Sequence, residues 1–81
     1  MTKSEAEEIA EKMRDAHKVP PSALIAASDK RYIEMADGNL DTASPVRDVL
    51  VWVIRFKFGI SWIDVAIDEN TKKMVRVQFS R

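Results

Sequence analysis

The clearest pattern in the sequence is the regular spacing of large hydrophobic residues from Val49 to Phe58. Every second position is hydrophobic, and the positions between them include two bases. A period of two is typical of a β-strand with one buried face. The face expected to be buried carries Leu50, Trp52, Ile54, Phe56 and Phe58, and the opposite face carries Val51, Val53, Arg55 and Lys57.

A second alternating segment follows over residues 60–68, and Gly59 supplies a turn between the two. This arrangement predicts an antiparallel hairpin, and a two-residue turn at Gly59 and Ile60 sets its register. The register pairs Phe56 with Ile63, Ile54 with Val65 and Trp52 with Ile67 on the buried face, and Arg55 with Asp64 and Lys57 with Trp62 on the other. A slip of one residue would turn the hydrophobic face to water.

A third strand is predicted near the end of the chain, after a polar turn at residues 69–73. Here Val75, Val77 and Phe79 alternate with Arg76, Gln78 and Ser80. Three sequential antiparallel strands form a meander, which needs a cover for its hydrophobic face.

The cover is expected to be an N-terminal amphipathic helix. Ser4 and Glu7 have the spacing of a capping box, so we expect the helix to begin at Ser4. Pro20 and Pro21 are expected to end it, because proline removes a backbone donor and restricts the residue before it. The hydrophobic stripe of this helix consists of Ala6, Ile9, Ala10, Met13 and His17.

The stretch from Ser22 to Ala36 is ambiguous. Residues 23–27 are rich in alanine and favour a helix, whereas residues 31–35 fit either a further turn or a short edge strand. Of these, we expect a short helix followed by a short strand. A turn is expected at Asp37, Gly38 and Asn39, followed by a loop over residues 41–45. The expected fold class is therefore α+β, with an N-terminal helix packed on a curved antiparallel meander of three to four strands, in a single domain spanning residues 1–81.

Composition narrows the possible partners. The 81 residues include thirteen bases and thirteen acids, so no overall positive charge attracts nucleic acid, and we expect no nucleic-acid partner. The longest hydrophobic run, residues 49–54, is too short to cross a bilayer, so no membrane insertion is expected. As the chain stands we expect it in the cytoplasm, or at the cell envelope or outside the cell if it is a processed fragment.

Catalytic and metal-binding motifs are not found. His17 is the single histidine and the chain has no cysteine, so zinc sites and histidine-based triads are not expected. Asp64, Asp68 and Glu69 lack the spacing of a calcium loop, and the two glycines do not form a phosphate loop. We therefore expect no enzymatic activity, no cofactor and no metal.

The second face of the predicted sheet is the candidate binding surface. On the predicted register Trp62 lies there beside Val51, Val53 and Lys57. Trp62 is expected either to stack on Lys57 or cap the sheet edge, or to anchor a partner, since tryptophan is enriched at interface hot spots. The residues expected to bind a protein partner are Trp62, Arg55, Lys57, Asp64 and Arg76.

Three segments resemble domains of the PepSY type. Residues 2–10 (TKSEAEEIA) resemble the first helix of that family, residues 51–56 (VWVIRF) its central strand, and residues 63–71 (IDVAIDENT) with 74–77 (MVRV) its closing hairpin. Lys72 stands where the family usually has a glycine. The resemblance implies regulation of peptidases or noncatalytic association at the cell envelope, with no catalytic residues. A wider resemblance is to cystatin-like and nuclear-transport-factor-like folds.

These observations lead to three functional hypotheses. The first is a noncatalytic PepSY-like binding or inhibitory module whose partner is a protein, either a peptidase or another copy of the chain. The second is a self-associating structural domain or an immunity-type protein. The third is a small cystatin-like or nuclear-transport-factor-like domain that binds a ligand between helix and sheet, although the predicted buried face offers almost no polar group for one.

Overall fold

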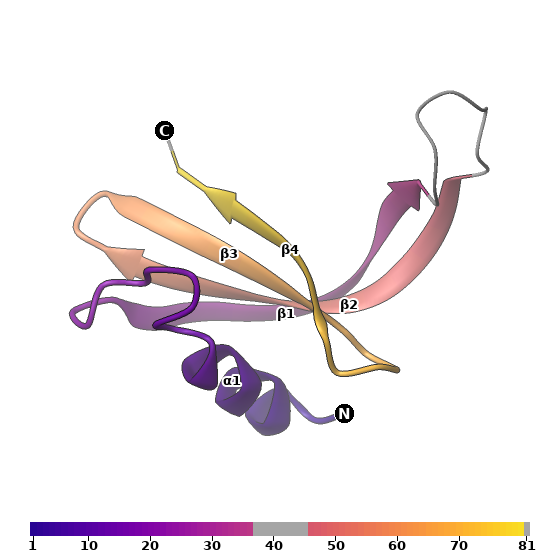
Figure 1. The fold of residues 1–81 in the computed structure, drawn as a ribbon, viewed down its shortest axis with the longest axis horizontal. Coiled ribbons are helices and arrows are strands. Elements are labelled where there is room, and N and C mark those ends of the chain that lie inside the picture. The colour runs from indigo at the N-terminus through magenta and orange to yellow at the C-terminus, as the bar shows by residue number, and fades with distance from the viewer. Residues whose placement is uncertain (37–45, 81) are drawn as a thin grey trace.

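The chain folds as one helix followed by four strands. The computed structural model describes residues 1–36 and 46–80. Helix α1 spans Lys3–Lys12, and the strands are β1 (Leu24–Ala36), β2 (Val46–Phe58), β3 (Ser61–Asp68) and β4 (Met74–Phe79). The strands form one antiparallel sheet in the order β1-β2-β3-β4, with α1 on one side of it (Figure 1). The predicted α+β class, with a helix on an antiparallel meander, is confirmed.

The register of the central hairpin is the one predicted. Phe56 lies opposite Ile63, and all four other predicted pairs of β2 and β3 are also present. Gly59 has a φ of 60°, in the left-handed region that glycine adopts without steric cost. The two-residue turn therefore sets the pairing of all eight residues of β3.

The N-cap of helix α1 lies two residues earlier than expected. Thr2, not Ser4, is the N-cap, and its Oγ1 accepts a hydrogen bond from the Glu5 backbone amide at 3.1 Å. Thr2 and Glu5 have the same spacing as Ser4 and Glu7, so the sequence contains two overlapping capping patterns. The prediction chose the inner pattern and was wrong.

The α-helix also ends before the two prolines, at Lys12, and a series of turns continues the chain. These turns end where the Val19 amide donates to the Arg14 carbonyl and the Lys18 amide to the Asp15 carbonyl. Lys18 has a φ of 55°. This is the Schellman arrangement that commonly ends helices, here with lysine at the position where glycine is usual. Chain reversal thus occurs before Pro20 is reached.

Residues 24–36 form a single strand, so the short helix predicted over residues 23–27 is wrong. Strand β1 is thirteen residues long and pairs with β2 from Leu24 to Ala36, with one bulge between Ile25 and Ala27. This pairing satisfies the backbone groups of the alanine-rich run and overrides its preference for helix. The turn expected at residues 37–39 and the loop expected at 41–45 lie outside the described residues.

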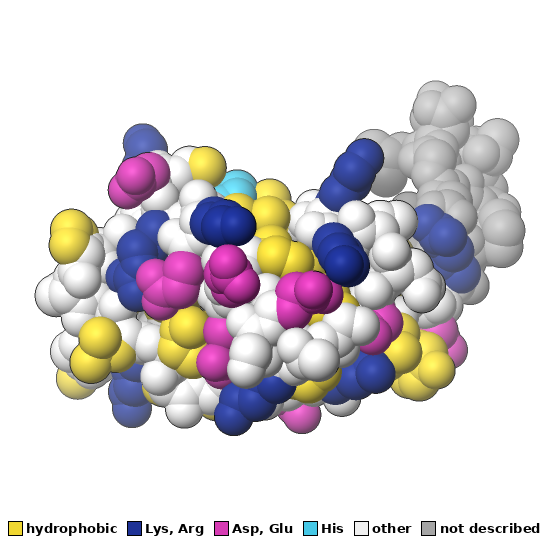
Figure 2. All heavy atoms as spheres, turned by 90° about the horizontal axis from the view of Figure 1, so that it is seen from below, with side chains coloured by type: hydrophobic (Ala, Val, Ile, Leu, Met, Phe, Trp, Pro, Cys, Tyr) yellow, Lys and Arg dark blue, Asp and Glu magenta, His cyan; other side chains and the backbone are white. Residues whose placement is uncertain are grey.

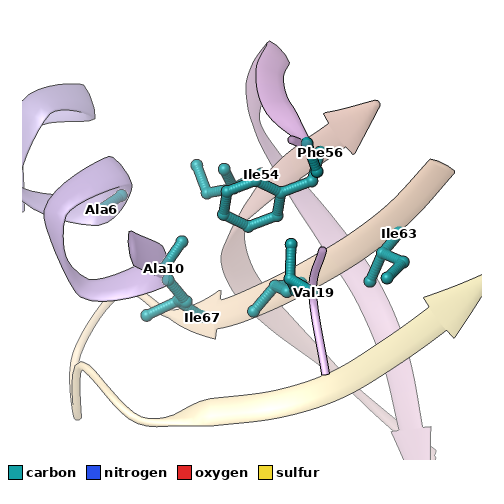
Figure 3. Close-up of a cluster of buried hydrophobic side chains, with 9 residues drawn as sticks. Ala6, Ala10, Val19, Ile54, Phe56, Ile63 and Ile67 are labelled. Atoms are coloured by element: carbon teal, nitrogen blue, oxygen red, sulfur yellow. The ribbon is translucent and has the colours of Figure 1, made fainter. Parts of the chain in front are cut away.

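The main core lies between α1 and the sheet (Figure 3). Ala6 and Ala10 of α1 are fully buried, and their small side chains bring the helix close to the sheet. Phe56 is the largest fully buried side chain, and the Arg14 guanidinium lies over its ring at 4.8 Å. The other buried members of this core are Val19, Ala23, Ile54, Ile63, Val65 and Ile67.

A second hydrophobic cluster lies on the sheet face turned away from α1, here called the outward face. Its buried members are Ile33, Val49, Val51, Val53 and Ala66. Figure 1 shows β1 and β2 curving away from the α1 side, so this face is concave. Val75 joins the cluster because a bulge in β4 shifts it away from Val77, contrary to the predicted alternation.

Candidate functional site

Three of the five predicted site residues meet on the outward face. Arg55 of β2 lies opposite Asp64 of β3 and binds it through two parallel contacts, Nε to Oδ1 at 2.7 Å and Nη2 to Oδ2 at 2.9 Å. The guanidinium also lies over the Trp62 ring, 4.3 Å from its centroid. Arg55 is thus held on one side by a carboxylate and on the other by an indole.

The electrostatics of this group follow from its burial. Asp64 is only 5% exposed, and a buried carboxylate requires a partner, which Arg55 supplies. The hydrogen bonds to Asp64 raise the pKa of the Arg55 guanidinium and outweigh the opposing effect of desolvation, and charge attraction to Asp64 adds a smaller contribution in the same direction. The Arg55 side chain remains 41% exposed. Its Nη1 group makes no hydrogen bond with the described residues, so this group is oriented yet able to donate to a partner.

Trp62 is fixed through its backbone. Its amide donates to Ser80 Oγ at 2.9 Å, and the Ser80 amide donates to the Trp62 carbonyl at 2.9 Å. These two bonds join the start of β3 to the residue after β4. The indole is half-buried, so part of it remains accessible on the outward face.

A hollow of about 210 Å³ adjoins Arg55. It is lined by Ala27, Asp29 and Arg31 of β1, Val53 and Arg55 of β2, and Asp64 of β3. Ala27 lies directly opposite Arg55, and its small side chain leaves space between longer neighbours. Asp29 and Arg31 form a loose ion pair at 3.9 Å along the rim.

The three β1 residues of this hollow were missed by sequence reasoning. The expected helix over residues 23–27 removed Ala27 from the sheet, and the expected strand began only at Arg31. The residues of β1 that share the outward face, Ala27, Asp29, Arg31, Ile33 and Met35, include two charged side chains, so no hydrophobic alternation identified the longer strand.

Lys57 and Arg76 lie on the same face but outside this cluster. Lys57 is the cross-strand neighbour of Trp62, as predicted, but the cation over the ring is Arg55. A planar guanidinium held by Asp64 stacks on an indole better than a flexible ammonium does. Arg76 lies opposite Ala66, and among the described residues no ion pair joins it to the other site residues.

A second polar cluster occupies the opposite side of the sheet, beside α1. Glu69 accepts a hydrogen bond from the Trp52 indole at 2.6 Å and one from the Met1 ammonium at 2.8 Å, and Lys30 Nζ lies 3.7 Å away. The pKa of Glu69 is lowered chiefly by the hydrogen bond from that ammonium, then by the indole hydrogen bond and the Lys30 charge, against the opposing effect of burial. Sequence reasoning had assigned Trp52 to the core and Glu69 to a turn.

The surface beside α1 carries both signs of charge. Figure 2 shows basic and acidic side chains interspersed there, with hydrophobic side chains between them. Within residues 1–36 and 46–80, no three His, Asp or Glu side chains converge as metal ligands would. The helical structure in the same residues is neither long nor apolar enough to span a bilayer.

Comparison of the chain with protein-family models, with curated proteins and with solved structures found no match.

Proposed function

We propose that this chain is a noncatalytic binding or inhibitory module of the PepSY type, which holds a protein partner on the outward face of its sheet. The observation that carries the proposal is the arrangement of Arg55 between Asp64 and Trp62. The guanidinium is fixed within the chain yet accessible beside a hollow. A side chain that is already ordered loses little entropy when a partner binds.

The chemistry of the site indicates what the partner presents. Arg55 Nη1 and the exposed Lys57 ammonium are donors, so they favour a carboxylate or a backbone carbonyl. Trp62, Ala27 and Val53 offer apolar surface beside these donors, and the remaining residues that line the hollow are charged. Arginine and tryptophan are the residue types most often found at interface hot spots. The partner is therefore expected to insert an apolar side chain next to an acidic one.

The resemblance to PepSY-type domains adds the class of partner, which is a peptidase. On this proposal the chain regulates the peptidase by occupying a surface and not by chemistry on a substrate. An acidic segment of the peptidase then contacts the outward face.

The test begins by identifying the partner with a photo-crosslinking amino acid. Placed at Lys57 in cells that naturally express the chain, the crosslinker is expected to capture a peptidase, which mass spectrometry identifies. The matched control is the same substitution at Lys73, which is also exposed but lies in the turn between β3 and β4. Capture of the same protein from both positions, or capture of a protein that is not a peptidase, contradicts the proposal.

Affinity measured by calorimetry with the purified partner then tests the site. Trp62→Ala and Lys57→Glu are each expected to weaken binding at least tenfold, about 1.4 kcal/mol, and Lys73→Glu to leave it unchanged. Thermal melts verify that each variant is folded. Unchanged affinity in a folded Lys57→Glu variant rejects the outward face as the binding surface even if Trp62→Ala unfolds.

A further inference from the structure

Strand β1 forms one edge of the described sheet, since its hydrogen-bonded neighbour there is β2 alone. An edge strand leaves alternate backbone amides and carbonyls unpaired, and these pair readily with another strand. At thirteen residues β1 is long for an edge, where natural proteins usually keep strands short. Tyr32, near its middle, is 68% exposed.

On the α1 side of this edge, Lys30 lies 3.7 Å from Glu69, whereas two acids of the described residues face each other without an ion pair. Lys30, Tyr32 and Glu34 point to this side, and Glu34 lies directly opposite Asp48 of β2. Both acids are exposed, and no ion pair among the described residues involves either of them. Like charges directly opposite on neighbouring strands repel, so this pair of acids favours the approach of a cation from a partner.

We propose that β1 pairs antiparallel with β1 of a second copy of this chain, about a two-fold axis that passes through Tyr32. The two four-stranded sheets then become one continuous sheet. Lys30 of each copy lies opposite Glu34 of the other, and Tyr32 lies opposite Tyr32. Because a two-fold axis repeats every contact, two cations reach the two acidic pairs that lack them.

Neighbouring registers are less favourable. An axis through Lys30 or through Arg31 places that base opposite its own copy, and an axis through Ile33 leaves Lys30 and Glu34 without charged partners. The register centred on Tyr32 has no like-charge pair on either face of β1, because Asp29 and Arg31 meet Met35 and Ile33 of the second copy. Charge complementarity thus selects both the partner and the register.

The hydrogen bond that joins α1 to β1 lies away from Tyr32. On β1, α1 is joined to Ser28, whose hydroxyl donates to Glu7. Ser28 is four residues from Tyr32, about 13 Å along the strand. The Ser28 residues of the two copies therefore lie on opposite sides of the two-fold axis. On the outward face, Ile33 of the second copy extends the hydrophobic cluster. The Trp62–Arg55–Asp64 group lies on β2 and β3, away from the pairing edge, so the interface goes beyond this group; only the β1 side of the hollow, Asp29 and Arg31, adjoins the second copy.

Cysteine crosslinking tests the register, because the chain has no cysteine of its own. Directly opposite residues of an antiparallel pair have Cα atoms about 4.5–5.5 Å apart, which suits a disulfide. Tyr32→Cys is therefore expected to form a covalent dimer under mild oxidation. The matched control is Lys30→Cys, in which the cysteines of the two copies are four residues out of register and are expected not to crosslink. When Lys30→Cys is mixed with Glu34→Cys, the two cysteines lie directly opposite each other and a crosslink is expected. Equal crosslinking of Tyr32→Cys and Lys30→Cys overturns the proposal.

Sedimentation velocity tests the association without crosslinks. The unmodified chain is expected to dimerise at micromolar concentration, and Glu34→Lys to weaken the dimer at least tenfold, because the introduced ammonium then faces Lys30 of the second copy. This variant puts a cation opposite Asp48, so the monomer stays folded. The double variant Lys30→Glu with Glu34→Lys restores opposite charges and is expected to restore the dimer.

Two results of the sedimentation experiment overturn the proposal. One is a monomer at every concentration up to the high micromolar range. The other is a dimer that the Glu34→Lys substitution leaves intact. If the Trp62→Ala substitution then abolishes that dimer, the interface lies on the outward face. Failure of the dimer proposal does not affect the expected capture of a peptidase at Lys57. Failure to capture a peptidase likewise does not affect the dimer proposal.

Discussion

Glu69 connects several parts of the chain on the side of the sheet that faces α1. Its carboxylate joins the Trp52 indole of β2, Lys30 of β1 and the Met1 ammonium. These contacts all favour the ionised form, so protonation of Glu69 weakens the connection between the chain start and the sheet.

The lowered pKa of Glu69 predicts a pH dependence of stability. A carboxylate whose pKa is lower in the folded than in the unfolded chain stabilises the fold fully above its ordinary value of 4.5, and this contribution is lost as the pH falls through the folded-state value. The difference in unfolding free energy between the unmodified chain and Glu69→Gln is therefore expected to be largest near neutral pH and to shrink below pH 4.5. Urea titrations at several pH values measure it. A difference independent of pH contradicts the prediction.

The candidate site was partly predictable residue by residue. Arg55 and Asp64 were expected to pair because they lie in a hairpin whose register a two-residue turn sets. The contact of Arg55 with Trp62 was not expected, because sequence reasoning placed the directly opposite Lys57 there. Diagonal neighbours on one face are also within reach of long side chains. Arg55 stacks on Trp62 because Asp64 holds its guanidinium in place.

At the level of elements, β1 and α1 mark the limit of what the sequence predicts. Strands β2, β3 and β4 alternate clearly, and their signals are local. Strand β1 owes its length to pairing with β2 across many intervening residues, and no local pattern reports such pairing. The bulge in β4 likewise follows from its pairing with β3 and reverses the side on which Val75 lies. Helix α1 was predicted, but its two ends depend on backbone hydrogen bonds that several neighbouring residues could have made.

The turn after α1 gives a prediction about Lys18. Lysine pays a steric penalty at a φ of 55°, which glycine avoids, while glycine adds entropy to the unfolded chain. Lys18→Gly is expected to raise the free energy of unfolding by about 0.5–1 kcal/mol, the balance of these two effects. The control Lys12→Gly, within α1, should lower it by about 1 kcal/mol. Urea denaturation of both variants measures this, and destabilisation by Lys18→Gly would show that the turn does not strain lysine.

Over the whole molecule, the sheet has a hydrophobic cluster on each face, but α1 covers only one of them among the described elements. Strands β1 and β2 are curved (Figure 1), and Val51, Val53 and Ala66 of the outward cluster are buried although α1 lies on the other face. The outward face therefore contributes to folding as well as offering a binding surface.

This arrangement predicts that Val51 behaves as a core residue although the one helix of the described residues lies on the other face. Its side chain is fully buried, so Val51→Ala is expected to lower the free energy of unfolding by about 1–3 kcal/mol. Val75→Ala, in the same cluster but half-buried on edge strand β4, should cost less. Urea denaturation compares the two. Equal small losses would mean that the concave face is hydrated in solution.

The two tryptophans lie on opposite sides of one sheet. Trp52 donates to a carboxylate beside α1, and Trp62 lies under a guanidinium on the outward face. The chain therefore carries an intrinsic optical reporter for each surface. Replacing either indole with phenylalanine leaves the emission of the other as a separate readout, so events on the two surfaces can be followed independently and without an attached dye.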